Sequence, residues 1–241
     1  MHYLNSISVY QRLKKEFETK IMTKSIVLLH SLANVIPIAI QAFQEEAADL
    51  DIMNVVDETV WYELQRSGTI STNIIRRVCL YAILAEQANA SVVLTTCSSL
   101  SPCFEVAKLC VNIPLIRLDS PVVKQAIEKG TRVGLVATAQ TTVQPYIEQV
   151  DQIARQSHKM VNPITIFCEG ALVALKQDNV KKHDEIVLTN ILNTLKTQPV
   201  DVLILCQASL HHIVDQLTRI LEIPILSALS LAIQEARERV E

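Results

Sequence analysis

Glycine is scarce in this 241-residue sequence, which contains only four. Neither G-x-G-x-x-G nor G-x-x-x-x-G-K occurs, so the sequence lacks the backbone loops that hold phosphates in Rossmann dehydrogenases and P-loop enzymes. This absence argues against both classes of nucleotide-binding enzyme.

The sequence also lacks an excess of charge of either sign and any long apolar run. A net charge of −3 gives no basic surface for nucleic acid or anionic membrane. No apolar stretch reaches the length of a membrane span, and residues 1–24 have no apolar core of the kind found in signal peptides. We therefore expect a cytoplasmic protein with reduced cysteines, a helical N-terminal extension at 1–24, and Met22 as an alternative start.

Short β-branched runs alternate with longer amphipathic stretches along the rest of the chain. The runs are apolar on both faces, as parallel strands covered by helices must be, so the sequence predicts an α/β fold with a parallel sheet. Strands are expected at 25–30, 52–57, 91–97, 113–118, 132–138, 162–168, 201–206 and 223–227. Helices are expected at 34–48, 71–88, 101–111, 120–129, 143–157, 180–196, 208–221 and 230–240.

The two halves of the chain are similar to each other. Ile113-Pro-Leu-Ile116 recurs as Ile223-Pro-Ile-Leu226, at an offset of 223 − 113 = 110 residues. A period this long indicates two copies of a domain, because solenoid repeats are shorter. The other matching blocks are 26–30 with 133–137 and 54–57 with 164–167, at offsets of 133 − 26 = 107 and 164 − 54 = 110.

Each half also ends an apolar run with a cysteine, Cys97 in the first and Cys206 in the second, 206 − 97 = 109 residues apart. Ligands bind beyond the carboxyl ends of parallel strands, and a helix start there favours a thiolate. Two facing thiols would remove a proton from one side of a carbon and deliver one to the other. The alternative is that both cysteines are small buried apolar residues, as are Cys79, Cys103, Cys110 and Cys168.

Five segments resemble the Asp/Glu racemase superfamily of cofactor-independent racemases, over nearly everything after Lys24. They are Thr95-Thr-Cys97-Ser-Ser99, Ile113-Pro-Leu-Ile-Arg-Leu-Asp119, Gly134-Leu-Val-Ala-Thr138-Ala-Gln-Thr141-Thr142, Gly170-Ala-Leu with His183-Asp184, and Leu205-Cys206-Gln-Ala-Ser209.

The resemblance implies two similar flavodoxin-like domains, each a parallel sheet flanked by helices, related by a pseudo-twofold axis. The first would comprise 25–98 and 209–241, and the second 99–208, with the active site in the cleft between them. Cys97 and Cys206 would be the two acid/base residues. The expected substrate-binding residues are His30, Ser31, Ser98, Ser99, Thr138, Thr141, Thr142 and Gln207.

The resemblance further implies a racemase or epimerase of a small carboxylate, such as aspartate or glutamate, that uses no cofactor and no metal. A homodimer is expected, without nucleic acid or membrane partners. Amino-acid racemases of this group usually carry Cys-Asn-Thr where this chain has Cys97-Ser98-Ser99, which leaves the substrate open. The alternatives are an isomerase or decarboxylase of a small dicarboxylic acid, and a non-catalytic ligand-binding relative.

Overall fold

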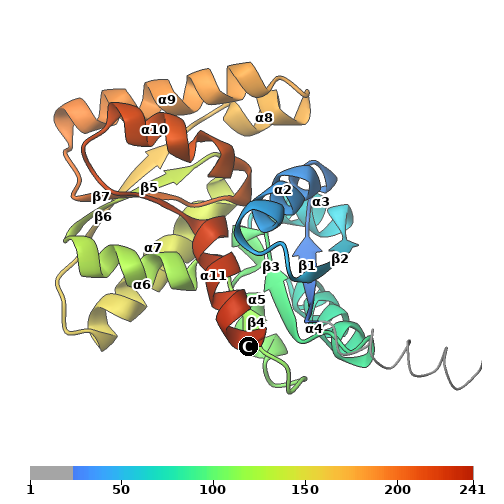
Figure 1. Cartoon of the computed structure of the whole chain (residues 1–241). Helices are drawn as coiled ribbons and strands as arrows, with labels where there is room; N and C mark the ends of the chain where they lie inside the picture. The colour runs from blue at the N-terminus through green and yellow to red at the C-terminus, as the bar shows by residue number, and fades with distance from the viewer. Residues whose placement is uncertain (1–23, 241) are drawn as a thin grey trace, which may run out of the picture.

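The computed structural model describes residues 24–240, which form two four-stranded parallel sheets flanked by helices (Figure 1). The first sheet has the order β2-β1-β3-β4 and the second the order β6-β5-β7-β8, so the duplication seen in the sequence is a duplication of topology. This confirms the predicted fold class. The strands are β1 (Ser25–His30), β2 (Asp51–Val56), β3 (Val92–Thr95), β4 (Leu115–Ile116), β5 (Arg132–Ala137), β6 (Asn162–Phe167), β7 (Val202–Leu205) and β8 (Ile225–Ser227).

The helices that accompany the first four strands are η1 (Ala33–Val35), α2 (Ile36–Glu46), α3 (Glu58–Ser67), α4 (Thr72–Gln87), η2 (Ser98–Leu100) and α5 (Cys103–Ala107). Those that follow are α6 (Ser120–Lys129), α7 (Gln140–Gln156), α8 (Ala171–Lys176), α9 (Val180–Thr197), η3 (Ala208–Ile213), α10 (Val214–Ile220) and α11 (Ala228–Val240). Among these described helices, none is long and apolar enough to cross a membrane.

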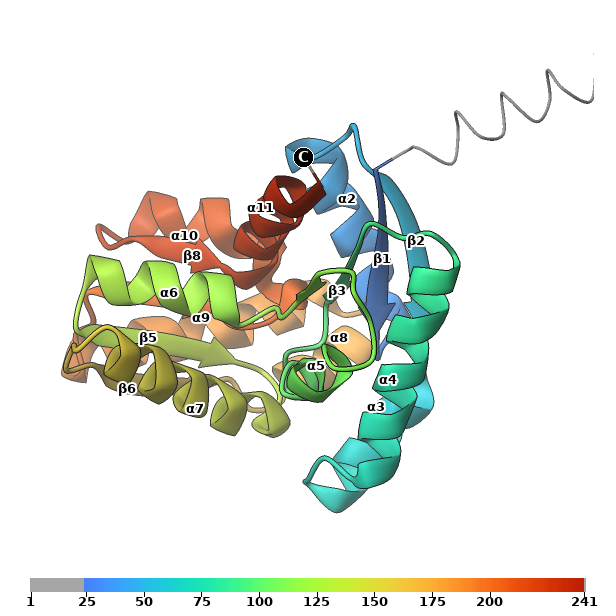
Figure 2. The same ribbon diagram turned by 90° about the horizontal axis from the view of Figure 1, so that it is seen from below.

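Three apolar layers hold the sheets together. One core joins the facing sides of β1, β3, β5 and β7 through α2, α6, α7 and α11. A second core lies between the outer side of the first sheet and α3, α4 and α5, and a third lies between the outer side of the second sheet and α8, α9 and α10. Figure 2 shows the two sheets side by side with helices around both. Because one core is common to both sheets, each domain stabilises the other.

The strand pairing differs from the expected division of the chain at residues 98 and 208. β4 pairs with β3 and therefore belongs to the first sheet, whereas β8 pairs with β7 and belongs to the second. α11 packs on α2 and β3 on the first sheet's side and also on α6, and it lies between the sheets in Figure 1. The expected extension at 1–24 falls, apart from Lys24, outside the described residues.

Two helices were not expected from the sequence. α3 begins after Asp57, whose carboxylate accepts a hydrogen bond from the Thr59 N–H, and ends at Gly68 with a left-handed φ of 69°. These are ordinary helix boundaries, and Val60 and Leu64 form the buried face. α8 is a short helix of six residues that begins after Gly170. Both helices contribute to the pocket described next.

Candidate active site

A pocket lies where the carboxyl ends of the two sheets meet. Its cavity volume is about 40 Å³, and about 480 Å³ when all the space up to its open mouth is included. Its walls come from the segments that follow β1, β3, β5 and β7, together with α3 and α8, which is where α/β folds bind ligands. All of the residues that line it are uncharged. They are Ser31, Leu32, Val35, Trp61, Thr96, Cys97, Ser98, Ser99, Ala139, Thr142, Leu172, Leu175, Gln207, Ala208 and Ser209.

Cys97 supplies the thiol of this pocket. It is partly buried at the start of η2, and its backbone N–H donates to the Thr95 hydroxyl at 3.1 Å. Burial raises the pKa of the Cys97 thiol above its ordinary value, while the Ser31 hydroxyl and the backbone N–H groups of Ser99 and Leu100 oppose this rise. Cys97 is therefore protonated at neutral pH and sits beside groups that stabilise its thiolate.

Cys206 does not line the pocket, and the prediction that it faces Cys97 across the cleft is wrong. Its side chain is fully buried in the core between the sheets, and its thiol donates to the Ile204 carbonyl oxygen at 3.7 Å. Burial raises the pKa of the Cys206 thiol well above its ordinary value. A thiol in this setting is an apolar packing group rather than an acid/base.

The error is a shift of one residue in the alignment of the two halves. Val93 pairs with Leu115 and Leu203 with Ile225, so the equivalent positions are 203 − 93 = 110 and 225 − 115 = 110 residues apart. At this offset the counterpart of Cys97 is Gln207, not Cys206.

The local geometry supports the same equivalence. Cys97 is the residue before η2 and Gln207 the residue before η3, and each backbone carbonyl accepts a hydrogen bond from the N–H three residues later at 3.0 Å. The Gln207 Oε1 accepts from the Thr138 N–H at 2.5 Å and from the Thr138 hydroxyl at 3.0 Å. The second half thus brings a fixed amide to the pocket where the first half brings a thiol.

The other expected substrate-binding residues divide into those that line the pocket and those that support it. Ser31, Ser98, Ser99, Thr142 and Gln207 line it. Thr138 instead anchors Gln207, and the Thr141 hydroxyl contacts the Ser99 hydroxyl at 2.8 Å, which links the start of α7 to the loop after β3.

His30 is not among the lining residues, contrary to the expectation. Its ring is fully buried, with Nδ1 2.8 Å from the Thr96 hydroxyl and Nε2 2.9 Å from the Asn54 Oδ1. Burial lowers the pKa of His30, against the opposing effect of the Asn54 hydrogen bond. A neutral imidazole with both nitrogens occupied fixes Thr96, which does line the pocket, so His30 acts through its neighbour.

Comparison with known proteins agrees with this architecture. A family model described as Asp/Glu/Hydantoin racemase matches residues 1–236. The chain belongs to this family. It is thereby homologous to racemases, which are isomerases. No curated protein matches the chain.

Solved structures of racemases share the fold of this family member at low sequence identity. Allantoin racemase from Klebsiella pneumoniae is 17% identical, with a TM-score of 0.70 over 90% of this chain and 88% of that one. Glutamate racemase from Francisella tularensis, in complex with D-glutamate, is 16% identical, with a TM-score of 0.69. The match covers 90% of this chain and 80% of that one. Aspartate racemase from Picrophilus torridus is 13% identical, with a TM-score of 0.70. The match covers 90% of this chain and 94% of that one.

Sequence reasoning missed the apolar wall of the pocket in this family member. Trp61 on α3 and Leu172 and Leu175 on α8 line it, and both helices were unexpected. The Lys176 ammonium lies 3.6 Å from the centroid of the Trp61 ring, so a cation–π contact joins α8 to α3 beside the pocket. The signal for α3 was available, since Asp57 and Gly68 mark its two ends.

Proposed function

We propose that this protein is a cofactor-independent isomerase that removes and returns a proton at the carbon next to a carboxylate or cyclic-amide carbonyl, with Cys97 as the acid/base. The observation that carries the proposal is the environment of Cys97, the one thiol among the residues that line the pocket. Membership of the racemase family supports the same type of reaction.

Proton transfer by Cys97 requires its thiolate. The Ser31 hydroxyl and the N–H groups of Ser99 and Leu100 stabilise the negative sulfur as it forms. The thiolate takes the α-proton, and the electron pair moves into the adjacent carbonyl to give an enolate. Water then protonates the opposite face of that carbon, and the hydroxide so formed takes the proton from the Cys97 thiol, so the configuration is inverted and the thiolate is restored. Hydroxyl and N–H donors around the pocket stabilise the developing oxyanion.

The lining of the pocket supports a substrate with one polar end and one apolar end. The polar groups for that end are the hydroxyls of Ser99 and Thr142 and the amide of Gln207, because the Ser98 hydroxyl already donates to the Cys206 carbonyl at 2.6 Å. Other lining side chains are apolar, and no lining residue is charged, so a second carboxylate would meet no cation in the pocket. For proton transfer this favours a monocarboxylate or a neutral hydantoin-like ring over aspartate or glutamate. The apolar residues are Leu32, Val35, Trp61, Leu172 and Leu175.

The amide of Gln207 favours a second candidate reaction, decarboxylation. Inversion by two bases needs an acid/base on each side of the carbon, and an amide does not exchange protons at neutral pH. In decarboxylation the bond between the α-carbon and a carboxylate breaks, CO₂ leaves, and the remaining enolate takes the Cys97 proton. The resulting thiolate is reprotonated by water, so one thiol is enough.

Solvent deuterium exchange tests the proposal. The protein is incubated in D₂O with D- and L-amino acids, 5-substituted hydantoins and 2-arylmalonates, and α-deuterium and CO₂ are measured. We expect deuterium at the α-carbon of a monocarboxylate or hydantoin with wild-type protein and none with Cys97→Ala. Cys110→Ser, a change at an exposed thiol, is the control and should retain wild-type exchange. Exchange by Cys97→Ala at the wild-type rate would remove the thiol from the mechanism.

A further inference from the structure

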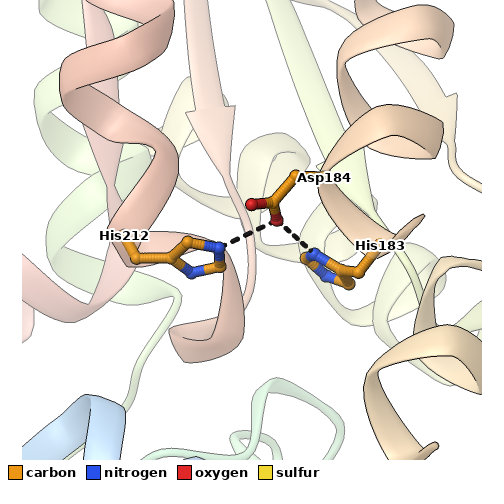
Figure 3. A group of neighbouring side chains, drawn as sticks. All are labelled: His183, Asp184 and His212. Carbon is orange, nitrogen blue, oxygen red and sulfur yellow. Dashed lines mark hydrogen bonds and ion pairs between the residues drawn. The ribbon is translucent and has the colours of Figure 1, made fainter. Parts of the chain in front are cut away.

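Three side chains away from Cys97 converge between α9 and η3. His183 and Asp184 are the fourth and fifth residues of α9, and His212 lies near the end of η3. The Asp184 Oδ1 is 2.8 Å from the His183 Nδ1 and 2.8 Å from the His212 Nε2 (Figure 3). All three atoms lie within 4.8 Å of one another.

We propose that His183, Asp184 and His212 form a binding site for a divalent transition-metal ion, with Zn²⁺ as the best fit. Two imidazole nitrogens and one carboxylate oxygen are a donor set that Zn²⁺ prefers, and a water molecule completes the tetrahedron. Ligand atoms around tetrahedral Zn²⁺ are about 3.3 Å apart, as metal–ligand distances of about 2.0–2.1 Å require. The two spacings of 2.8 Å to the Asp184 Oδ1 need widening by about 0.5 Å to reach this, and the two histidine nitrogens, which lie within 4.8 Å of each other, must come to the same separation.

The nitrogen of each histidine that faces Asp184 would hold the metal, and the ring proton would then sit on the other nitrogen. The His183 Nε2 is buried and without a hydrogen-bond partner, so moving the ring proton from Nδ1 to Nε2 breaks no bond at Nε2. The His212 side chain is 32% exposed, so with the metal on Nε2 its Nδ1–H can donate a hydrogen bond to solvent. Both metal-facing nitrogens are thus available as lone pairs.

A route for the ion is present on the His212 side. His212 lines an open cavity together with the carboxylate residues Glu45, Glu46 and Asp215. Carboxylates around a cavity raise the local concentration of cations. His212 is exposed and His183 is buried, so of the two histidines His212 is the one that an ion in this cavity can reach first.

The site is connected to the pocket through η3. Ala208 and Ser209 at its start line the pocket, and His212 lies three residues after Ser209. A metal bound to His212 and to α9 would therefore fix one wall of the pocket. This inference concerns a second site and stands independently of the reaction proposed for Cys97.

Metal titration of the full-length protein tests the proposal. Zn²⁺ alone is titrated by calorimetry, and Co²⁺ is titrated to detect the visible absorption of tetrahedral coordination. We expect one Zn²⁺ per chain and a rise in the melting temperature. His212→Ala and Asp184→Asn should weaken Zn²⁺ binding at least about tenfold, the loss caused even by removal of an outer-shell partner.

His211→Ala is the matched control. His211 is adjacent in sequence, but its Nδ1 contacts the Ser227 hydroxyl at 2.9 Å, and it should bind Zn²⁺ as tightly as wild type. Cys110→Ser removes an exposed thiol as an alternative ligand and should also leave the affinity unchanged. No saturable Zn²⁺ binding by the wild type, or equal affinity in the wild type and His212→Ala, would overturn the proposal.

Discussion

Cys97 and Gln207 occupy equivalent positions at the carboxyl ends of the central strands of the two sheets. Each precedes a 3-10 helix, and each carbonyl accepts a hydrogen bond from the N–H three residues later at 3.0 Å. The duplicated fold thus presents a thiol from one half and an amide from the other. The chemistry of the pocket is therefore asymmetric although its framework is not.

This asymmetry predicts that exchange and inversion are separable. With Cys97 on one side, wild-type protein should exchange the α-proton of one enantiomer for deuterium faster than it forms the other enantiomer. Gln207→Cys places a second thiol opposite and should raise the rate of inversion relative to exchange by on the order of 100-fold, the scale of acid/base catalysis. Chiral chromatography and mass spectrometry of the same samples measure both rates. Gln207→Ser, which adds no group with a thiol's acidity, should not change the ratio.

The two cysteines should respond differently to replacement. Cys97→Ala should abolish exchange with little loss of stability, because Cys97 is partly exposed to the pocket. Cys206→Ala should retain exchange but lower the free energy of unfolding by about 1 kcal/mol, the scale for removing one buried heavy atom. Urea unfolding and the deuterium assay separate these effects. Loss of exchange in a folded Cys206→Ala protein would return Cys206 to the mechanism.

The activity should rise with pH. Burial raises the pKa of Cys97 above its ordinary value of 9.0, so the thiolate is a minor species at neutral pH. The reactive fraction then grows by about tenfold per pH unit until the pH reaches that pKa. Ser31→Ala removes a group that lowers the pKa of Cys97 and should move the break in the profile of kcat/KM to higher pH. A profile that is flat from pH 7 to the ordinary value of 9.0 would contradict this assignment.

Most of the framework of the site was predictable because it follows from local patterns. The apolar β-branched runs predicted the eight strands, and the order of the matching sequence blocks indicated the duplication. The position of Cys206 was not predicted, because a strand-end residue faces the pocket or the core according to a register set by pairing with a distant strand. The Cys206 N–H, for example, bonds to the Val136 carbonyl, and one residue of shift reverses the direction of the side chain. The offset of 110 in the neighbouring Ile-Pro blocks was the available sign that Gln207 matches Cys97.

The pocket wall contains the only tryptophan of the chain, Trp61, so intrinsic fluorescence should report ligand binding without any assay of activity. A ligand that enters the pocket displaces water from the indole ring and should shift its emission in proportion to occupancy.

Lys176→Met keeps the apolar stem but removes the charge that lies 3.6 Å from the centroid of the Trp61 ring. Loss of this exposed cation–π contact, worth about 0.5–1 kcal/mol, should weaken ligand binding by about two- to fivefold if it holds α3 and α8 together around the ligand. Lys181→Met on the neighbouring α9 is the matched control and should bind as wild type does. Equal affinities for Lys176→Met and Lys181→Met would show that the contact between Lys176 and Trp61 does not position the wall.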